Sequence, residues 1–297
     1  MATPTVASST TQAFTGSTST VVCTKPSGLA VGDVLFAFSF QQLAGAGILV
    51  TPPAGWTVIS SVATSRLAFQ AHLVCWKVAD AADVAAANFT TFTSSRTAVT
   101  GGILCRLTGL VSGVEVETSE VDTSDTPAAS FSFTGSSTPR ATNTLAIACL
   151  LGFDGTIASV VTVGSYTSTP TLTWTEVADI GYRDGASDGG SIALAYANHT
   201  TTTQITAYGA TFSLSMGSRD GVLTLLNGDV SATGQVSHVN VDPTIHSPST
   251  INSTTAQISH LNAPVNVNGF KTADTGPRTN WTPITKSPTT WTNVDKS

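Results

Sequence analysis

A period-two alternation of apolar and polar residues constrains the fold of this chain most, and it recurs as far as about residue 228. In one stretch Val34, Phe36, Phe38 and Phe40 share a face of an extended strand. Turns rich in glycine, aspartate or asparagine separate such stretches. Further strands are expected at residues 73–79, 103–107, 145–151, 192–197 and 222–226. The pattern predicts an all-β protein, an antiparallel two-sheet sandwich resembling a jelly roll.

The composition agrees with this fold class. Charged residues make up 10% of the 297 residues, against about 25% in an ordinary globular domain. The hydrophobic fraction is 41%, and threonine and valine favour a pleated, half-buried surface. One short helix is expected at residues 79–88, where alanine is frequent and Asp80 is a suitable N-terminal cap.

The order of strands is repeated along the chain, which predicts an internal duplication. Trp56 precedes the strand at Leu73 by 17 residues, and Trp174 precedes the strand at Ile192 by 18 residues. In each half another strand follows, at residues 103–107 and 222–226. The alternative is coincidence in a β-rich sequence of low complexity.

The character of the sequence changes after Gly228. Residues 229–297 are rich in asparagine, threonine, serine and proline, and prolines exclude a central strand. So few apolar residues cannot offset the entropy of ordering this segment by themselves. We therefore expect a β-sandwich domain at residues 1–228 and an extended, mostly irregular arm at residues 229–297.

One stretch matches an enzyme motif. Residues 185–189, GASDG, fit the G-x-S-x-G pattern of a nucleophile elbow, with Ser187 as the nucleophile. That motif needs a helix after the serine, whereas a strand is expected here. We therefore expect a hairpin loop, no catalytic residue, no enzymatic activity and no cofactor.

Other chemistry-bearing residues lack metal-site spacing. Acidic residues near 115–125, with Asp184 and Asp188, leave a structural calcium ion or solvated loops as alternatives. The five histidines show no ligand spacing, and the three in the arm, His238, His246 and His260, are expected to be polar surface residues, with the coaxial histidine rings of trimeric fibres as the alternative. The four cysteines lie far apart in apolar runs, so we expect buried thiols and no zinc site.

Trp56 and Trp174 have two interpretations. They can pack in the cores of the two halves, which their equivalent positions favour, or serve, like loop aromatics such as Tyr182, as platforms that stack on sugars.

Composition also bears on partners. A net charge of −6 with twelve Lys and Arg residues predicts no nucleic-acid binding. No apolar run approaches the ~18 residues of a membrane span, and the first twenty residues do not fit a secretory signal.

Three short motifs resemble a known family. They are Gly32-Asp33 before a strand, Pro53-Ala54-Gly55-Trp56-Thr57, and Lys77-Val78-Ala79 closing a strand. This pattern resembles β-sandwich virion proteins of tailed bacteriophages, of the minor-tail or fibre type. The resemblance covers about a third of the chain and implies a structural role without catalytic residues.

The end of the chain also resembles phage structural proteins, some of which end in W-T-x-x-x-K-S repeats. Here the unit occurs twice, as WTPITKS and WTNVDKS. Tryptophan is enriched at interface hot spots, and an extended arm can add a strand to a sheet edge. The residues expected to bind a partner are Trp281, Ile284, Lys286, Trp291, Val294 and Lys296.

The sequence therefore predicts a non-enzymatic phage virion protein, a tail-tip or fibre component anchored by its arm after assembly in the host cytoplasm. Expected partners are other virion proteins, copies of itself and a host-surface glycan. The alternatives are a capsid decoration protein and a carbohydrate-binding adhesin module.

Overall fold

The fold is that of a computed structural model, which describes most of the chain up to Asn227. The described residues are 3–42, 50–64, 70–110, 116–124, 127–139, 142–154, 159–184 and 188–227. We refer to residues 3–110 as the N-terminal repeat and to residues 116–227 as the C-terminal repeat.

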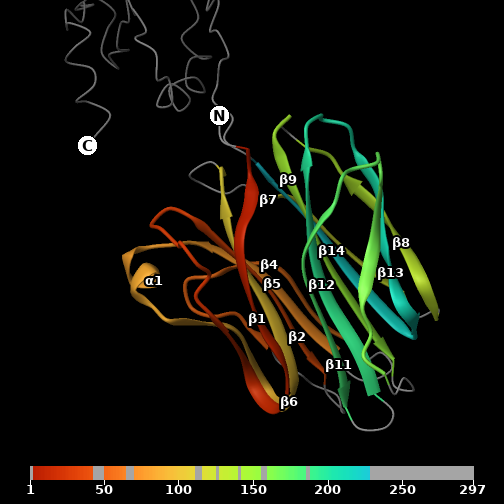
Figure 1. The fold of residues 1–297 in the computed structure, drawn as a ribbon, viewed down its shortest axis with the longest axis horizontal. Coiled ribbons are helices and arrows are strands. Elements are labelled where there is room, and N and C mark those ends of the chain that lie inside the picture. Colours follow the sequence, from red (N-terminus) through yellow and green to blue (C-terminus); the bar gives the residue numbers. More distant parts are fainter. Residues whose placement is uncertain are drawn as a thin grey trace, which may run out of the picture. The chain divides into compact units, whose positions relative to one another are not determined.

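The N-terminal repeat consists almost entirely of antiparallel strands (Figure 1). Its elements are β1 (Thr5–Thr24), β2 (Val34–Gln42), β3 (Val50–Thr51), β4 (Thr57–Thr64), β5 (Gln70–Val78), α1 (Ala81–Ala85) and β6 (Asn88–Thr108). Five of the strands form a sheet in the order β1-β6-β2-β5-β4, and the short strand β3 pairs with the first part of β6.

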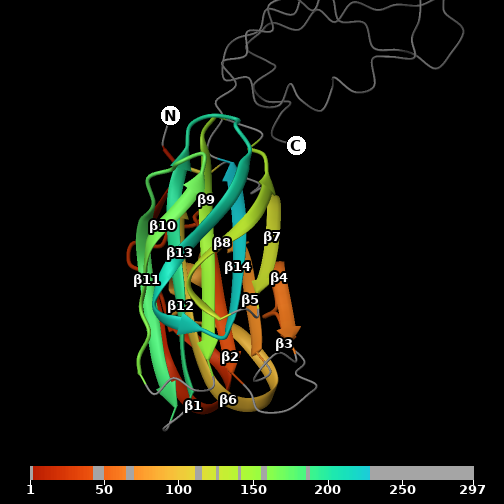
Figure 2. The same cartoon turned by 90° about the vertical axis from the view of Figure 1, so that its right-hand side faces the viewer.

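The C-terminal repeat contains the remaining strands. They are β7 (Val116–Ser124), β8 (Ala128–Ser137), β9 (Thr144–Asp154), β10 (Val163–Thr169), β11 (Thr175–Asp184), β12 (Asp188–His199), β13 (Ile205–Met216) and β14 (Ser218–Asn227). Five of them form a sheet in the order β11-β12-β9-β14-β7, and a separate sheet has the order β10-β13-β8 (Figure 2).

The strand orders show that the second repeat copies the first. The larger sheet of the N-terminal repeat has the order β4-β5-β2-β6-β1, and that of the C-terminal repeat has the order β11-β12-β9-β14-β7. Strands at the same place in these two orders also come at the same place along the two repeats. The remaining strands match too, because β8, β10 and β13 pair as the second part of β1, β3 and the first part of β6 do. The topology therefore supports the duplication expected from the sequence.

Three apolar cores hold this arrangement together. The inter-repeat core lies between the two larger sheets, where Phe36 and Phe38 of β2 cluster with Ile147 and Leu151 of β9. A second core lies between the C-terminal repeat's larger sheet and the three-stranded sheet. A third lies on the other face of the N-terminal sheet. Consequently β2, β9 and β14 are buried on both faces, which explains the long apolar runs of β2 and β9.

The repeats differ in how they cover their outer faces. In the N-terminal repeat β1 and β6 continue past the larger sheet, and their pairing shifts register several times between Gln12 and Thr20. Such bulges let paired strands bend, and Val21 folds back over the sheet. Gly102 permits this approach, because a Cβ there would lie 2.4 Å from Val21 Cγ1. In the C-terminal repeat the corresponding strands are divided into β7 and β8, and β13 and β14.

The predicted fold class is confirmed, because the described chain is all-β and antiparallel with almost no helix. The three-stranded sheet is an addition to the two sheets expected from the sequence. Its strands bury only one face each, so their apolar pattern is weaker. The helix α1 also forms as expected, with Asp80 accepting a hydrogen bond from the Asp83 backbone N–H in a capping box.

We predict that Phe212→Ala, in β13, lowers the free energy of unfolding by about 3–5 kcal/mol. Phe212 is buried, and its ring stacks on Phe131 with the centroids 4.9 Å apart. Leu214→Ala, on the same strand at a position that is 37% exposed, is the matched control and should cost much less. Chemical denaturation measures both, and equal losses would contradict the packing of the third sheet.

Candidate functional site

The predicted arm lies outside the described residues. Its six partner-binding residues, Trp281, Ile284, Lys286, Trp291, Val294 and Lys296, therefore stay predictions. The domain boundary at residue 228 stays one as well.

The would-be nucleophile Ser187 also lies outside the described residues, but its flanks are informative. β11 and β12 pair antiparallel up to Asp184 and Asp188, and β12 continues as a strand to His199. A strand therefore follows the motif where a nucleophile elbow requires a helix. The hairpin predicted from the sequence is confirmed.

A buried polar cluster joins the two repeats, and sequence reasoning missed it. His72 of β5 and Asp220 of β14 lie in the inter-repeat interface, with His72 Nδ1 3.6 Å from Asp220 Oδ2. On the other side of the imidazole, Ser60 Oγ of β4 lies 3.3 Å from His72 Nε2. The imidazole ring also lies in an edge-to-face arrangement with the Phe38 ring, with the centroids 6.3 Å apart. Three strands from both repeats thus bring together a serine, a histidine and an aspartate.

The order of these groups is that of a hydrolase triad, but their burial argues against catalysis. Ser60 is 5% exposed, His72 1% and Asp220 2%, so a substrate carbonyl has no route to the serine between the described strands. The distances also exceed the 2.6–3.2 Å expected between a nucleophile and its base. The cluster is better explained as part of the packing between the repeats.

The two histidines outside the arm are buried, which the sequence did not predict. His72 is buried in the interface, and His199 is buried at the end of β12, where the Thr201 backbone N–H donates to its Nδ1. Burial lowers the pKa of His199. Period-two alternation placed His72 on the same face as Val74 and Trp76, and that was the available signal.

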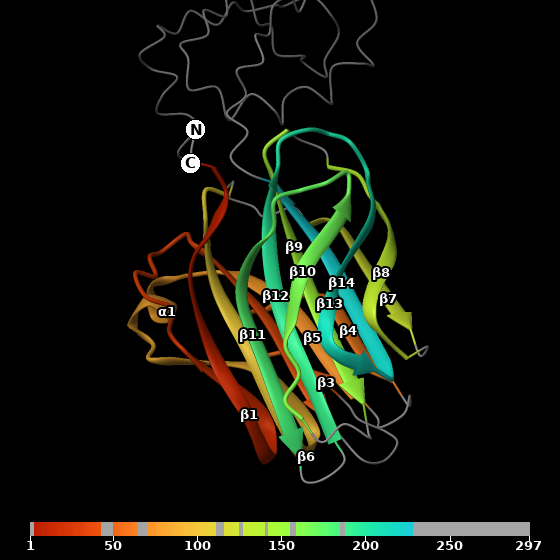
Figure 3. The same cartoon turned by 45° about the vertical axis from the view of Figure 1, so that its right-hand side comes forward.

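The opposite end of the interface is aromatic. Phe14 of β1 packs on Phe40 of β2 and on Tyr182 of β11, with ring centroids 5.8 and 4.3 Å away. The Tyr182 hydroxyl donates to Gln42 Oε1 across the repeats. Tyr182 is only 4% exposed, so the interpretation of it as a sugar-stacking loop residue is wrong. Figure 3 shows β1 and β11 beside each other at this edge.

The two equivalent tryptophans pack within their own repeats. Trp56 lies partly buried against the third core, and Trp174 lies partly buried against the second. The indole N–H of Trp174 donates to Ser168 Oγ. These contacts favour the structural interpretation over the sugar-binding one.

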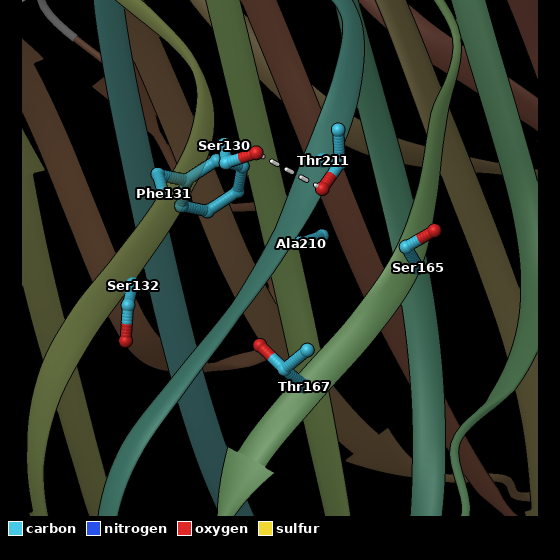
Figure 4. A pocket seen from close by; sticks show the side chains of 7 residues that line it. All are labelled: Ser130, Phe131, Ser132, Ser165, Thr167, Ala210 and Thr211. Atoms are coloured by element: carbon cyan, nitrogen blue, oxygen red, sulfur yellow. Dashed lines mark hydrogen bonds between the residues drawn. The ribbon is translucent and has the colours of Figure 1, made fainter.

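The outer face of the three-stranded sheet carries hydroxyl groups. β8, β10 and β13 contain no charged residue, and Ser130, Ser132, Ser165, Thr167 and Thr211 line a shallow depression there (Figure 4). The Ser130 and Thr211 hydroxyls lie within hydrogen-bonding distance of each other. This face offers neutral donors and acceptors but no stacking platform, since Phe131 is 8% exposed.

Two carboxyl groups of β11 have raised pKa values. Burial and the neighbouring Asp179 raise the pKa of Glu176, and burial raises the pKa of Asp179. Asp179 accepts hydrogen bonds from the Val163 backbone N–H and the Ser191 hydroxyl, which ties β10 to β12. These bonds give the carboxylate a structural role.

The four cysteines are free and buried, as predicted. Burial raises the pKa of Cys23 to about 11 and that of Cys75 to about 12. Burial also raises the pKa values of Cys105 and Cys149 well above the usual value for a thiol. A thiol that stays protonated is a poor nucleophile, so these residues act as small apolar side chains.

No group of three or more potential metal ligands occurs among the described residues. Within the same residues, no helix has the length and apolar character to cross a membrane. The chain matches no protein-family model, no curated protein and no solved structure.

We predict that none of the four thiols reacts with iodoacetamide in the folded protein near pH 8. Their burial and raised pKa values leave too little accessible thiolate. All four should react after unfolding in denaturant, which is the positive control. Intact-mass spectrometry counts the adducts, and rapid modification of the native chain would contradict the described burial.

We further predict a distinct pH dependence for Asp179→Asn. The folded pKa of Asp179 lies above its unfolded value of about 3.9. Its contribution to stability is therefore fully present below about pH 3.9 and is lost as pH rises through the folded pKa. The wild-type chain should lose stability relative to the variant over that interval, measured by denaturation at several pH values.

Asp80→Asn is the opposing control. The backbone N–H of Asp83 lowers the pKa of Asp80, so stability from Asp80 is lost as pH falls. Parallel pH profiles for the two variants would contradict the assignment.

Proposed function

We propose that this chain is a non-enzymatic structural protein of a tailed-bacteriophage particle, displayed on its surface and anchored through residues 229–297. Two kinds of observation support the proposal. The short motifs around Gly32, Trp56 and Lys77 resemble virion β-sandwich proteins, and the closing W-T-x-x-x-K-S units resemble the ends of such proteins.

The observation that carries the proposal is how the apolar surface is distributed. The described repeats bury their apolar faces in three cores that are built from their own strands. Trp281 and Trp291 follow in a segment whose composition is too polar to build a core of its own. Large indole groups in such a segment are suited to binding a second surface.

The buried state of the Ser60, His72 and Asp220 side chains favours a structural role over a hydrolytic one. A tail-tip or fibre position fits the neutral hydroxyl face of the three-stranded sheet. Serine and threonine hydroxyls both donate and accept hydrogen bonds, as the hydroxyls of a host-surface glycan do.

A capsid decoration protein is the second candidate, because an arm ending in repeated units also suits a repeating lattice. The two candidates differ in copy number: a decoration protein is present in many copies per particle, and a tail component in few. Quantitative mass spectrometry of purified particles separates them.

We predict that deleting Gly276–Ser297 leaves a folded protein that no longer joins particles. The two repeats and their cores lie outside the deletion, whereas both tryptophans are removed. Incorporation is measured in purified particles by immunoblotting, with circular dichroism as the test of folding.

An internal deletion of equal length, residues 245–266, is the matched control, because it shortens the arm and keeps both repeated units. Trp281→Ala combined with Trp291→Ala should reproduce the loss without any change in length. Normal incorporation of the chain that lacks Gly276–Ser297 would refute the anchoring role.

A further inference from the structure

The inter-repeat interface is built from equivalent strands of the two repeats. The two larger sheets have the same strand order, and β1 meets β11 at one edge while β7 meets β4 at the other. Exchanging the repeats exchanges these two contacts. The interface thus has the form of a two-fold dimer contact within a single chain.

An interface built from equivalent strands allows two competing kinds of pairing, within one chain and between two chains. If the two inner faces were equivalent, an N-terminal repeat could pair as well with the same repeat of another copy as with its own C-terminal repeat. Something in the interface has to distinguish the two kinds of pairing. Apolar side chains distinguish poorly, because their attraction is non-directional.

The strand register shows where the two faces differ. In the N-terminal repeat one cross-strand row consists of His72, Phe40 and Gly101. The corresponding row of the C-terminal repeat consists of Ile192, Leu151 and Asp220. The ionisable residues occupy non-equivalent places, so His72 of one repeat meets Asp220 of the other.

Gly101 of the N-terminal repeat takes the place that Asp220 has in the C-terminal repeat, and Ile192 takes the place of His72. Neither Gly101 nor Ile192 carries an ionisable side chain. Gly101 leaves room for Phe14, whose ring lies 2.9 Å from the position that a Cβ would occupy. The row therefore has a contact between two ionisable side chains at one end of the interface, whereas the other end is built on aromatic packing and the Tyr182–Gln42 hydrogen bond.

We infer that the buried His72–Asp220 contact favours pairing of the two different repeats of one chain over pairing of identical repeats from two chains. Pairing of two N-terminal repeats would place His72 opposite Gly101. Pairing of two C-terminal repeats would place Asp220 opposite Ile192. Either arrangement buries an ionisable group without its partner from the other repeat: His72 would keep only Ser60, and the carboxylate of Asp220 would face an apolar side chain, which is strongly unfavourable.

The inference is independent of the particle-building proposal and is tested on the full chain. His72→Leu leaves Asp220 buried without its partner, and we expect the unfolding equilibrium constant to rise about 100-fold or more. The double variant His72→Leu with Asp220→Val replaces the pair by apolar side chains. Its unfolding constant should lie within about tenfold of the wild-type value.

The decisive measurement is assembly after refolding at high protein concentration. Because the double variant has lost the buried His72–Asp220 contact, it should form dimers and larger species well beyond the wild-type level. Size-exclusion chromatography with light scattering measures this. Ile192→Leu, a conservative change at the two-fold-related position, is the matched control and should assemble as the wild type does.

Each outcome decides the inference. Rescue of stability together with increased self-association supports it, and rescue of folding counts as rescue of stability if the single variant does not fold. Additive losses, a double variant that does not fold, or a stable double variant that assembles as the wild type does would overturn it.

Discussion

The constraint on which this structure depends is that its central strands are buried on both faces. β2 and β14 are buried along their whole lengths and β9 along all but its last residue, so each must be covered twice. The inner faces cover each other in the inter-repeat core, and each outer face is covered by strands of its own repeat. A single two-sheet sandwich would leave one face of each sheet exposed to water, which is why additional layers are present.

The sequence predicted those central strands well, because large apolar residues mark them. Phe36, Phe38 and Phe40 alternate without interruption, and the equivalent positions of Trp56 and Trp174 indicated the duplication that the topology supports. The outer strands were harder to predict. β1 and β13 expose one face and are built largely of serine, threonine and small residues, so their apolar contrast is low.

The polar cluster could not be predicted from the sequence for a different reason. His72 and Asp220 belong to different repeats, and only the pairing of the two larger sheets brings them together. Alternation identifies the face of a strand on which a residue lies, but it does not identify the residue that this face meets. The same limit applies to Tyr182, which sequence reasoning assigned to a loop and the fold places against Phe14.

The position of the last described strand has a mechanical consequence. Residue 228 continues from β14, which is hydrogen-bonded to β9 on one side and to β7 on the other. Tension applied at the C-terminal end of β14 and directed along the strand would load both ladders of hydrogen bonds together. Resistance to such tension is set by the barrier to unfolding rather than by equilibrium stability. A force applied at that end of the chain therefore acts on an interior strand. Its hydrogen bonds to β9 and to β7 resist the force at the same time and do not break one after another.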